Sequence, residues 1–424
     1  MMTLRRKQQL WYILTDLISS ELVWLCFLIF RWLVFDGRAA VMGDVLIPAF
    51  SFWPPLIVYP LICLCVYYLS GYYLRPFQKP LWREFLRTFG SAIVISLLFF
   101  FIIIIDDKVT DYHHYIGSLG VLFALQFLLS YFPRLTVTLL SRNRGIIRTH
   151  VIHSLEEVAT LHPGEQDEII IDLPAGYSDR ELYTLIARLY PLSCEISMVP
   201  RVYDMMTGAA RIGFIDHPSL IRITEHHMTD AELCIKRAFD IVVSAISLVL
   251  LSPLMGLIAL QVKLSSKGPV IYSQERIGMY GLPFRIYKFR TMMDHAEADG
   301  VPRLTLDDDP RITGIGHWLR KYRLDELPQL WNILRGDMSI VGPRPERPYF
   351  IEKIMSEAPY YCLIYKVRPG LTSWGPIRVG YTDTMEKMIE RLNCDIVYVE
   401  NMSLLLDLKI MFFTIGIILH GKGQ

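Results

Sequence analysis

The sequence lacks several features that would assign it to a common soluble class of protein. Its 43 Lys and Arg residues nearly balance its 42 Asp and Glu residues, so the formal net charge is +1 and gives no case for nucleic-acid binding. The seven cysteines contain no CxxC pair and are odd in number, which predicts reduced, structural thiols. No GxGxxG motif follows a predicted strand, which argues against a complete dinucleotide-binding domain.

Long apolar runs, in contrast, are abundant. Hydrophobic residues make up 52% of the chain, and crossing the hydrocarbon core of a bilayer takes about 20 residues in a helix. The first run is too long for the apolar region of a cleavable signal peptide, and no small-residue cleavage site follows it. We therefore predict a four-span helical membrane bundle within residues 1–140, with apolar runs at residues 10–30, 45–74, 88–105 and 115–133.

The charge of the short loops predicts the orientation of this bundle. Basic residues precede the first span, separate the second from the third and follow the fourth, whereas the alternate loops are poor in them. By the positive-inside rule, both ends of the bundle lie in the cytoplasm. The basic residues are Arg5, Arg6, Lys7, Arg75, Lys79, Arg83, Arg87, Arg142, Arg144 and Arg148.

Residues 141–230 read as a truncated α/β Rossmann-like module in the cytoplasm. Residues 167–174 form an apolar strand followed by a turn, residues 179–189 have helical spacing, and residues 194–200 resemble a second strand. The first βαβ unit of a full dinucleotide-binding domain is missing. We expect a structural or dimerising role for this module, not nucleotide binding.

A fifth apolar run, at residues 238–262, has basic residues at both ends. Lys236 and Arg237 precede it, and Lys263 follows it, so both ends carry the cytoplasmic signature. Ser252 and Pro253 lie in its middle, where proline removes a backbone donor and crowds the preceding turn. We predict a re-entrant hairpin broken at these two residues, and a straight span with a proline kink is the alternative.

The most informative stretch, residues 320–345, reads RKYRLDELPQLWNILRGDMSIVGPRP and places Asp325 and Glu326 among arginines. Pro328 suits the first turn of a helix and Gly336 its end. The helix N-terminus favours ionised carboxylates, as an attacking or metal-binding group requires. An acidic cap on a surface helix is the alternative reading. The apolar set Leu327, Leu330, Trp331 and Leu334 has helical spacing and should face a core.

This stretch and several ordered blocks around it resemble the bacterial sugar transferases, that is, polyprenyl-phosphate glycosyl-1-phosphate transferases of the large single-hairpin membrane type. The blocks are QERIG at 274–278, FRIYKFRTM at 284–292, DPRITGIG at 309–316 and RPGLTSW at 368–374. The resemblance implies that residues 231–424 form an α/β catalytic domain, anchored by a re-entrant membrane helix hairpin at 238–262. Any one block alone would be weak, and their order gives the specificity.

The resemblance implies a reaction as well. Asp325 would attack the β-phosphorus of a UDP-sugar, expel UMP and carry the sugar 1-phosphate to polyprenyl (undecaprenyl) phosphate, with Glu326 positioning groups or assisting the second step. Mg²⁺ is expected, with Asp325 as a ligand, because a divalent cation offsets repulsion between carboxylate and phosphate. The protein would be a multi-pass protein of the bacterial inner membrane with a cytoplasmic active site, would initiate lipid-linked polysaccharide synthesis, and would form a homodimer.

Cations near the carboxylates are candidates for binding phosphate. Arg344 lies between two prolines and has the planar fork that suits a diphosphate. The further candidates are Lys288, Arg290, Arg320, Arg335, Lys236 and Arg237. The alternative interpretation of any single arginine here is a solvated surface charge.

Two other functions stay open at this point. The run Asp307, Asp308 and Asp309 could bind the metal of a glycosyltransferase that releases UDP, and a catalytically inactive membrane scaffold is a third reading. The chain also departs from the family at one loop, because relatives commonly read PGLTGWAQ where Ser373 and Gly375 occur here. This departure leaves the transferred hexose open.

Overall fold

The computed structural model divides into two compact units, each described here by itself. One unit comprises residues 1–147 with 229–235, and the other comprises 148–228 with 236–424. The structure describes residues 4–31, 33–34, 53–74, 81–106, 112–144, 148–161, 163, 167–174, 176–192, 194–200, 220–223, 227–293, 309–380 and 384–420. The bundle loops at 35–52, 75–80 and 107–111 lie outside these residues, as do Asp307 and Asp308.

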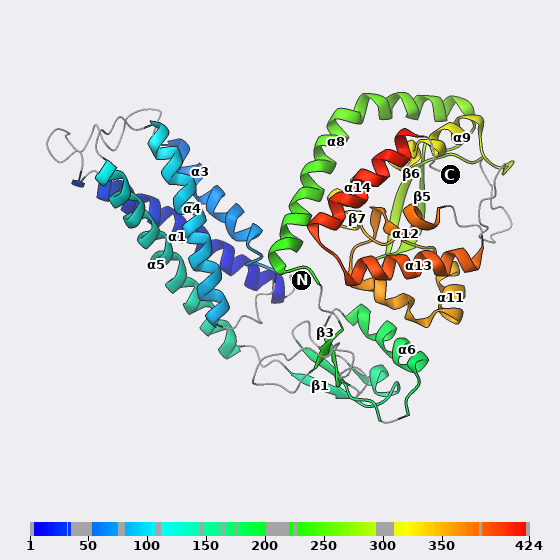
Figure 1. Ribbon diagram of the computed structural model, residues 1–424, viewed down its shortest axis with the longest axis horizontal. Coiled ribbons are helices and arrows are strands. Elements are labelled where there is room, and N and C mark those ends of the chain that lie inside the picture. The colour runs from blue at the N-terminus through cyan, green and yellow to red at the C-terminus, as the bar shows by residue number, and fades with distance from the viewer. Residues whose placement is uncertain are drawn as a thin grey trace. The chain divides into compact units, whose positions relative to one another are not determined.

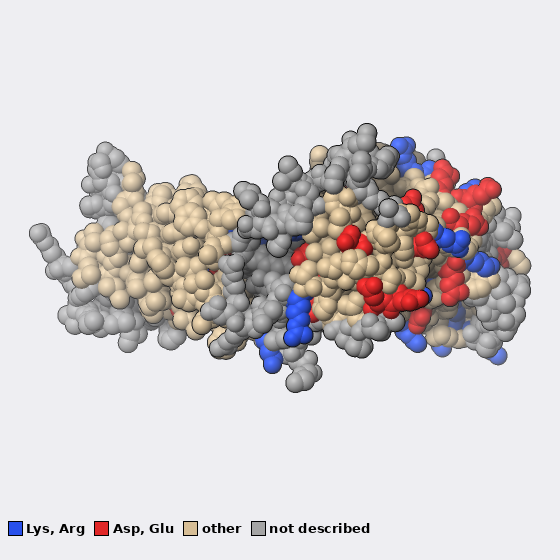
Figure 2. All heavy atoms as spheres, turned by 90° about the horizontal axis from the view of Figure 1, so that it is seen from below, with Lys and Arg blue, Asp and Glu red and all other residues tan. Residues whose placement is uncertain are grey.

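The first unit is a bundle of long apolar helices (Figure 1). Its helices are α1 (Leu4–Arg31), α3 (Trp53–Leu69), α4 (Leu81–Asp106) and α5 (Tyr112–Arg144). Three of them are long and apolar enough to cross a membrane, and α8 of the second unit is the fourth such helix in the described chain. The second expected span is described as a 17-residue helix, about 26 Å long and therefore shorter than a bilayer core. The visible surface of this unit shows almost no charged atoms (Figure 2).

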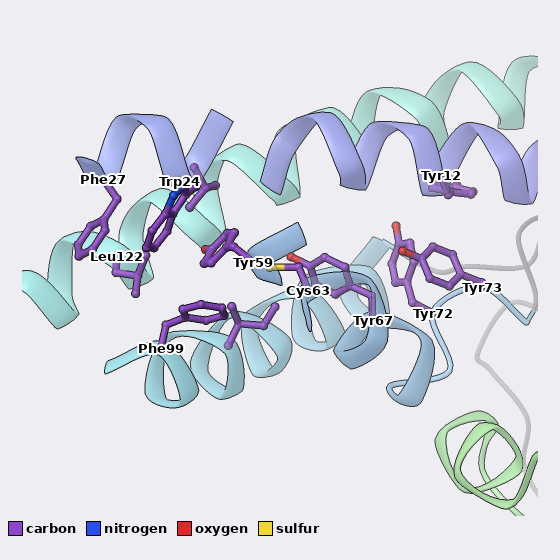
Figure 3. Packing of buried hydrophobic residues seen from close by; sticks show 12 residues of the cluster. Tyr12, Trp24, Phe27, Tyr59, Cys63, Tyr67, Tyr72, Tyr73, Phe99 and Leu122 are labelled. Atoms are coloured by element: carbon purple, nitrogen blue, oxygen red, sulfur yellow. The ribbon is translucent and has the colours of Figure 1, made fainter. Parts of the chain in front are cut away.

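Aromatic side chains fill one part of the bundle interior (Figure 3). The ring of Trp24 on α1 lies 5.1 Å from that of Tyr59 on α3 and 6.0 Å from that of Phe99 on α4. Leu122 of α5 belongs to the same cluster. These large side chains bring all four helices onto one core.

A second part of the interior is polar. Asp16 of α1 and Arg134 of α5 are fully buried and form an ion pair at 2.5 Å. The Tyr73 hydroxyl donates to Asp16 at 2.6 Å, and the Arg134 guanidinium lies 3.7 Å from the centre of the Tyr67 ring. Because unpaired charge in a bilayer is costly, these contacts hold α1 and α5 in register.

The second unit contains a four-stranded sheet of order β1-β2-β3-β4. Strands β1 (Thr149–Ile152), β2 (Glu168–Ile171) and β3 (Glu195–Met198) are parallel, and β4 (Ile221–Arg222) pairs antiparallel with β3. The helix α6 (Asp179–Leu189) joins β2 to β3 and begins with a capping box from Ser178. The two strands and the helix expected from sequence are therefore present, and the described part of the β1–β2 connection holds a short 3₁₀ turn (Glu157–Thr160).

The remaining part of this unit builds the candidate site around a β-hairpin and a short parallel ladder. The hairpin pairs β5 (Ile271–Ile277) with β6 (Pro283–Phe289), and the ladder pairs β7 (Ser339–Val341) with β8 (Gly370–Thr372). The helices are α8 (Asp230–Ser265), α9 (Gly314–Lys321), α10 (Gln329–Arg335), α11 (Pro348–Glu357), α12 (Trp374–Val379), α13 (Met385–Glu400) and α14 (Leu404–Leu419), with 3₁₀ turns at Tyr190–Leu192, Met279–Gly281, Leu324–Glu326 and Pro359–Lys366.

The long helix α8 bends through Ser252 and Pro253 without interruption (Figure 1). Proline cannot donate to the carbonyl four residues back, and the Ser252 hydroxyl donates to that Val249 carbonyl at 2.8 Å instead. The break expected at these residues is therefore a bend within one helix.

Contacts near both ends of α8 reach the same part of the second unit, residues 236–424. Near its start, Asp240 accepts a hydrogen bond from the Ile340 N–H at 3.0 Å. Near its end, Ile258 and Val262 pack with Phe289 and Leu319. Between these contacts α8 exposes Val249 and other large apolar side chains.

Candidate active site

The Asp-Glu pair lies in a tight turn that precedes α10. Arg323 has a left-handed backbone (φ 52°), and Leu324–Glu326 form one 3₁₀ turn. Pro328 then caps α10, which ends at Gly336 (φ 95°), as the sequence predicted. Both carboxylates are buried, with Asp325 7% and Glu326 6% exposed. The turn therefore withdraws two acidic groups from water, where they need partners or a ligand.

The buried face of α10 differs from the predicted one. Leu330 is buried, but Trp331 is 54% exposed. Asn332 and Ile333 are buried instead, and the Asn332 amide donates to the Arg285 carbonyl at 2.7 Å. The prediction that Trp331 faces the core was therefore wrong. A buried asparagine that holds β6 replaces it, and an apolar pattern cannot reveal that contact.

Three cations surround Glu326. The Lys288 ammonium, from β6, lies 2.6 Å from its carboxylate. The guanidinium groups of Arg323 and Arg344 lie at 3.5 and 3.6 Å. Burial alone would raise the pKa of Glu326, but Lys288, Arg344 and Arg323 together hold that pKa well below its usual range. Glu326 is therefore a fixed anion that keeps the cations in place.

Asp325 has a different environment from its neighbour. It makes no hydrogen bond and no ion pair with any residue in the described ranges. Burial raises the pKa of Asp325 to about 6, against the opposing effects of Lys288, Arg320 and Arg323. From the sequence, the helix N-terminus is expected to favour the ionised form of Asp325. Burial outweighs any such effect, because the pKa is raised. With this pKa, Asp325 is still mostly ionised at neutral pH, and its carboxylate has no hydrogen bond or ion pair among the described residues.

Arg344 lies in the loop that follows β7. The close packing of the β7 and β8 backbones positions this loop. A Cβ on Gly370 would lie 2.1 Å from the Gly342 nitrogen, so β7 and β8 approach closely only because both positions are glycine. The Arg344 side chain is 31% exposed. Burial lowers the pKa of Arg344, but the negative charges of Glu326 and Glu346 raise it by more, so the pKa lies above its ordinary value. A permanently charged, partly exposed guanidinium group thus lies beside the Asp-Glu pair.

The structure places the other candidate cations in three kinds of environment. Arg320 donates to the Thr291 hydroxyl at 2.9 Å, and its charge acts on Asp325. Arg335 is 52% exposed and lies 3.6 Å from Asp337. Arg290 donates to the carbonyls of Val262, Pro269 and Ser266, so it holds the end of α8 against β6.

Lys236 and Arg237 also contact the chain itself. The Lys236 ammonium pairs with Asp407 of α14 at 2.5 Å and donates to the Val341 carbonyl at 2.9 Å. Arg237 donates to the carbonyls of Ile333 and Leu334 at 2.7 and 3.1 Å, at the end of α10. These contacts fasten the start of α8 to the elements that carry the Asp-Glu pair. The structure therefore brings Lys288 and Arg344 to Glu326 and leaves Lys236 and Arg237 as anchors.

Two residues near the site were not identified as functional from the sequence. The first is Arg323, which was not among the candidate cations and whose side chain lies 3.5 Å from Glu326. Asp395 of α13 binds the Arg344 N–H at 3.1 Å. No sequence motif pointed to Asp395, because its link to the site exists only through tertiary contact.

The site offers one carboxylate to a metal ion. Among the residues that the structure describes, no three His, Cys, Asp or Glu side chains gather as a metal cluster. Asp309, the described member of the acidic run, is bound by the Arg311 side chain at 2.6 Å. Mg²⁺ commonly takes one or two protein carboxylates and completes its shell with substrate phosphates and water. Asp325 alone fits such a shared site.

The comparison with protein families matches the region that contains this site. The family model "Bacterial sugar transferase" matches residues 231–421. The chain is 39% identical over 233 residues to the UDP-glucose:undecaprenyl-phosphate glucose-1-phosphate transferase of Escherichia coli (strain K12), covering 54% of this chain and 50% of that protein. It is 36% identical over 257 residues to the UDP-N-acetylgalactosamine-undecaprenyl-phosphate N-acetylgalactosaminephosphotransferase of Aeromonas hydrophila, covering 61% and 60%.

These two alignments span only about half of each relative's length. A shorter relative is matched almost completely. It is the exopolysaccharide production protein PSS of Rhizobium leguminosarum bv. phaseoli, 40% identical over 202 residues that cover 45% of this chain and 99% of that protein. The ordered motifs, the site that they build and this full-length match lead to one conclusion: the chain belongs to the bacterial sugar transferase family.

Proposed function

We propose that this protein transfers a sugar 1-phosphate from a UDP-sugar to undecaprenyl phosphate and releases UMP. The observation that carries the proposal is the contrast within the Asp-Glu pair. Glu326 is held by three cations, whereas the buried carboxylate of Asp325 has no partner among the described residues. Relatives that align with this chain are named for transfer from a UDP-sugar to undecaprenyl phosphate, which supports the substrate class.

In the first step, a carboxylate oxygen of Asp325 attacks the β-phosphorus of the UDP-sugar. A bond forms between that oxygen and phosphorus, and the phosphoanhydride bond to the α-phosphate breaks. UMP leaves with the bonding electron pair, and the sugar 1-phosphate stays on Asp325 as an acyl phosphate. A covalent intermediate divides the encounter of two anions into two steps, each assisted by cations.

In the second step, a phosphate oxygen of undecaprenyl phosphate attacks the same phosphorus. The bond to Asp325 breaks, the carboxylate is restored, and the product is an undecaprenyl diphosphate-linked sugar. Glu326 keeps Lys288 and Arg344 in place through contacts of 2.6 and 3.6 Å. These cations are close enough to neutralise charge that develops on the transferring group.

We assign Arg344 to the diphosphate of the donor, with Lys288, Arg323 and Arg320 as neighbouring charges. The Arg344 fork can contact two phosphate oxygens at once, which a lysine cannot do. Mg²⁺ would be held by Asp325 together with substrate phosphates and, when bound, would offset the repulsion between carboxylate and phosphate.

We propose further that α8 is a re-entrant element on the cytoplasmic side of the inner membrane. A straight helix of 36 residues is about 54 Å long, which would carry its far end across a bilayer core of about 30 Å. Instead, Asp240 and Val262 contact the same catalytic part of the chain. The exposed apolar middle of α8 then enters the lipid while Asp325 stays at head-group depth, where a lipid phosphate and a soluble donor can meet.

Topology can be tested by labelling single cysteines with an impermeant maleimide on intact cells. Lys267→Cys, after the bend, should stay unlabelled until the cells are opened, because Lys267 is exposed and the proposal puts it on the cytoplasmic side. Lys108→Cys, in a loop that the charge pattern puts outside, is the positive control, and the parent chain controls for the seven native cysteines. Labelling of position 267 on intact cells would reject re-entrance.

The reaction is tested with UDP-sugars that carry ³²P in the β-phosphate, using a panel of hexose donors. We expect UMP release, label on the protein before acceptor is added, and transfer of that label to undecaprenyl phosphate afterwards. Asp325→Asn should lose all three signals, whereas Glu352→Gln, an exposed change on α11, should retain them. Label that leaves in UDP would identify a UDP-releasing glycosyltransferase instead.

A further inference from the structure

A single buried carboxylate joins the two loops that meet beside the candidate site. Asp395 of α13 is 3% exposed. It accepts hydrogen bonds from the Ser373 hydroxyl at 2.5 Å, the Gly375 N–H at 2.8 Å and the Arg344 N–H at 3.1 Å. Ser373 lies between β8 and α12, Gly375 lies in the first turn of α12, and Arg344 belongs to the loop after β7. Asp395 therefore links the loop that carries Arg344 to the loop that carries Ser373.

The β7–β8 ladder ends just before these hydrogen bonds. Two backbone hydrogen bonds hold the chain up to Pro343, from the Gly342 N–H to the Thr372 carbonyl at 3.0 Å and from the Gly370 N–H to the Pro343 carbonyl at 2.9 Å. At the next residue, the Arg344 N–H has the Asp395 carboxylate as its partner. Asp395 therefore continues the hold on this loop at the residue whose side chain faces the candidate site.

Gly375, two residues after Ser373, packs closely against α13. A Cβ on Gly375 would lie 2.4 Å from the Arg391 Cγ and 2.9 Å from an Asp395 carboxylate oxygen, so only glycine lets this N–H approach. Burial raises the pKa of Asp395, while the hydrogen bonds from Ser373, Arg344 and Gly375 lower it. The Ser373 hydroxyl therefore helps the Asp395 carboxylate to stay oriented in the interior.

The Ser373 hydroxyl and the Gly375 N–H share one acceptor atom. Both donate to Oδ1 of Asp395, and of the three donors described above only that of Ser373 belongs to a side chain. A residue without a hydroxyl at position 373 would remove that donor and leave the two backbone N–H groups.

We propose that Ser373 is a positioning residue that fixes the loop of Arg344 through Asp395 and thereby sets how tightly the donor is bound. The inference rests on the proposed function for its kinetic consequence, but not for its structural one. Ser373 itself is 5% exposed and need not touch substrate. Its effect reaches the donor through Arg344.

The test compares Ser373→Ala and Ser373→Thr with Ser356→Ala, an exposed serine of α11 that serves as the control. Losing one hydrogen bond of this kind corresponds to about a 3- to 10-fold effect. We expect Ser373→Ala to raise KM for the best UDP-sugar about 3- to 10-fold, with a smaller change in kcat for UMP release. Ser373→Thr retains the hydroxyl and should return KM toward the wild-type value.

Amide hydrogen exchange supplies a readout that does not need activity. In Ser373→Ala, the peptide containing Arg344 should exchange faster, while a β5–β6 peptide exchanges as in the wild type. Unchanged exchange at Arg344 would overturn the link, whether or not the protein releases UMP. Faster exchange with an unchanged KM would overturn the donor-binding role, and an inactive wild type would reject the proposed function while exchange still decides the link. If Ser373→Thr does not fold, Ser373→Ala still decides both points.

Discussion

Asp325 and Glu326 are both buried, but among the described residues only Glu326 is paired with cations. Neutralising the two carboxylates should therefore change the free energy of unfolding in opposite directions. Asp325 is buried without a partner among the described residues, and burial raises its pKa from 3.8 to about 6. This difference corresponds to about 3 kcal/mol of unfavourable free energy when the group is ionised in the folded state. We expect Asp325→Asn to abolish UMP release and to make the folded protein more stable at pH 7.5, by up to about 3 kcal/mol.

The pH dependence of this gain follows from the raised pKa. The protonated carboxyl of Asp325 contributes stability that is fully present below pH 3.8 and is lost as pH rises through about 6. The advantage of Asp325→Asn over the wild type should therefore be large at pH 7.5 and mostly gone at pH 4. Urea unfolding in detergent, followed by tryptophan fluorescence at both pH values, measures it.

Glu326→Gln is the matched comparison. Its pKa is lowered by Lys288, Arg344 and Arg323 despite burial, so its ionised form contributes stability that is lost only as pH falls through that lowered pKa. Removing this anion leaves three cations facing one another, and we expect a loss of about 3 kcal/mol at pH 7.5. Equal or lower stability of Asp325→Asn, or a gain from Glu326→Gln, would refute the assignment of the two environments.

Three further predictions concern the same site. In the donor half-reaction without lipid acceptor, kcat/KM for UMP formation should fall about tenfold per pH unit well below pH 6, because Asp325 attacks only when ionised; a flat profile from pH 4 to 7 would contradict this. Arg344→Lys should lower kcat/KM for the donor at least threefold, about 0.7 kcal/mol, and a smaller loss in the same assay would argue against a two-pronged contact. Gly370→Ala places a Cβ 2.1 Å from the Gly342 nitrogen and should lower the free energy of unfolding by about 1–3 kcal/mol in urea, whereas Gly314→Ala meets nothing within 4 Å and is the control.

Local patterns predicted much of the fold because they depend on neighbours in the chain. The capping residues Pro328 and Gly336 gave the limits of α10, and the strands and helix of the α/β module fell where hydrophobic periodicity put them. The same reasoning failed at Trp331, which is exposed, because an apolar residue is compatible with either face until its partners are known. Hydrophobicity alone also predicted a second membrane span that is longer than the described helix α3.

For the candidate site as well, some features follow from the sequence and others only from the tertiary structure. The sequence by itself determined that Asp325 and Glu326 are adjacent, that cations surround them in the chain and that an apolar run with a proline in its middle precedes them. Only the tertiary structure decided that Glu326 takes the cations while Asp325 is left without a partner in the described chain, and that Arg237 and Arg290 bind carbonyls of the chain itself. It also brought Asp395 to the Arg344 loop. The physical reason is that a charge's role depends on distances of a few ångströms and on exclusion of water, and both arise from contacts between residues far apart in the chain.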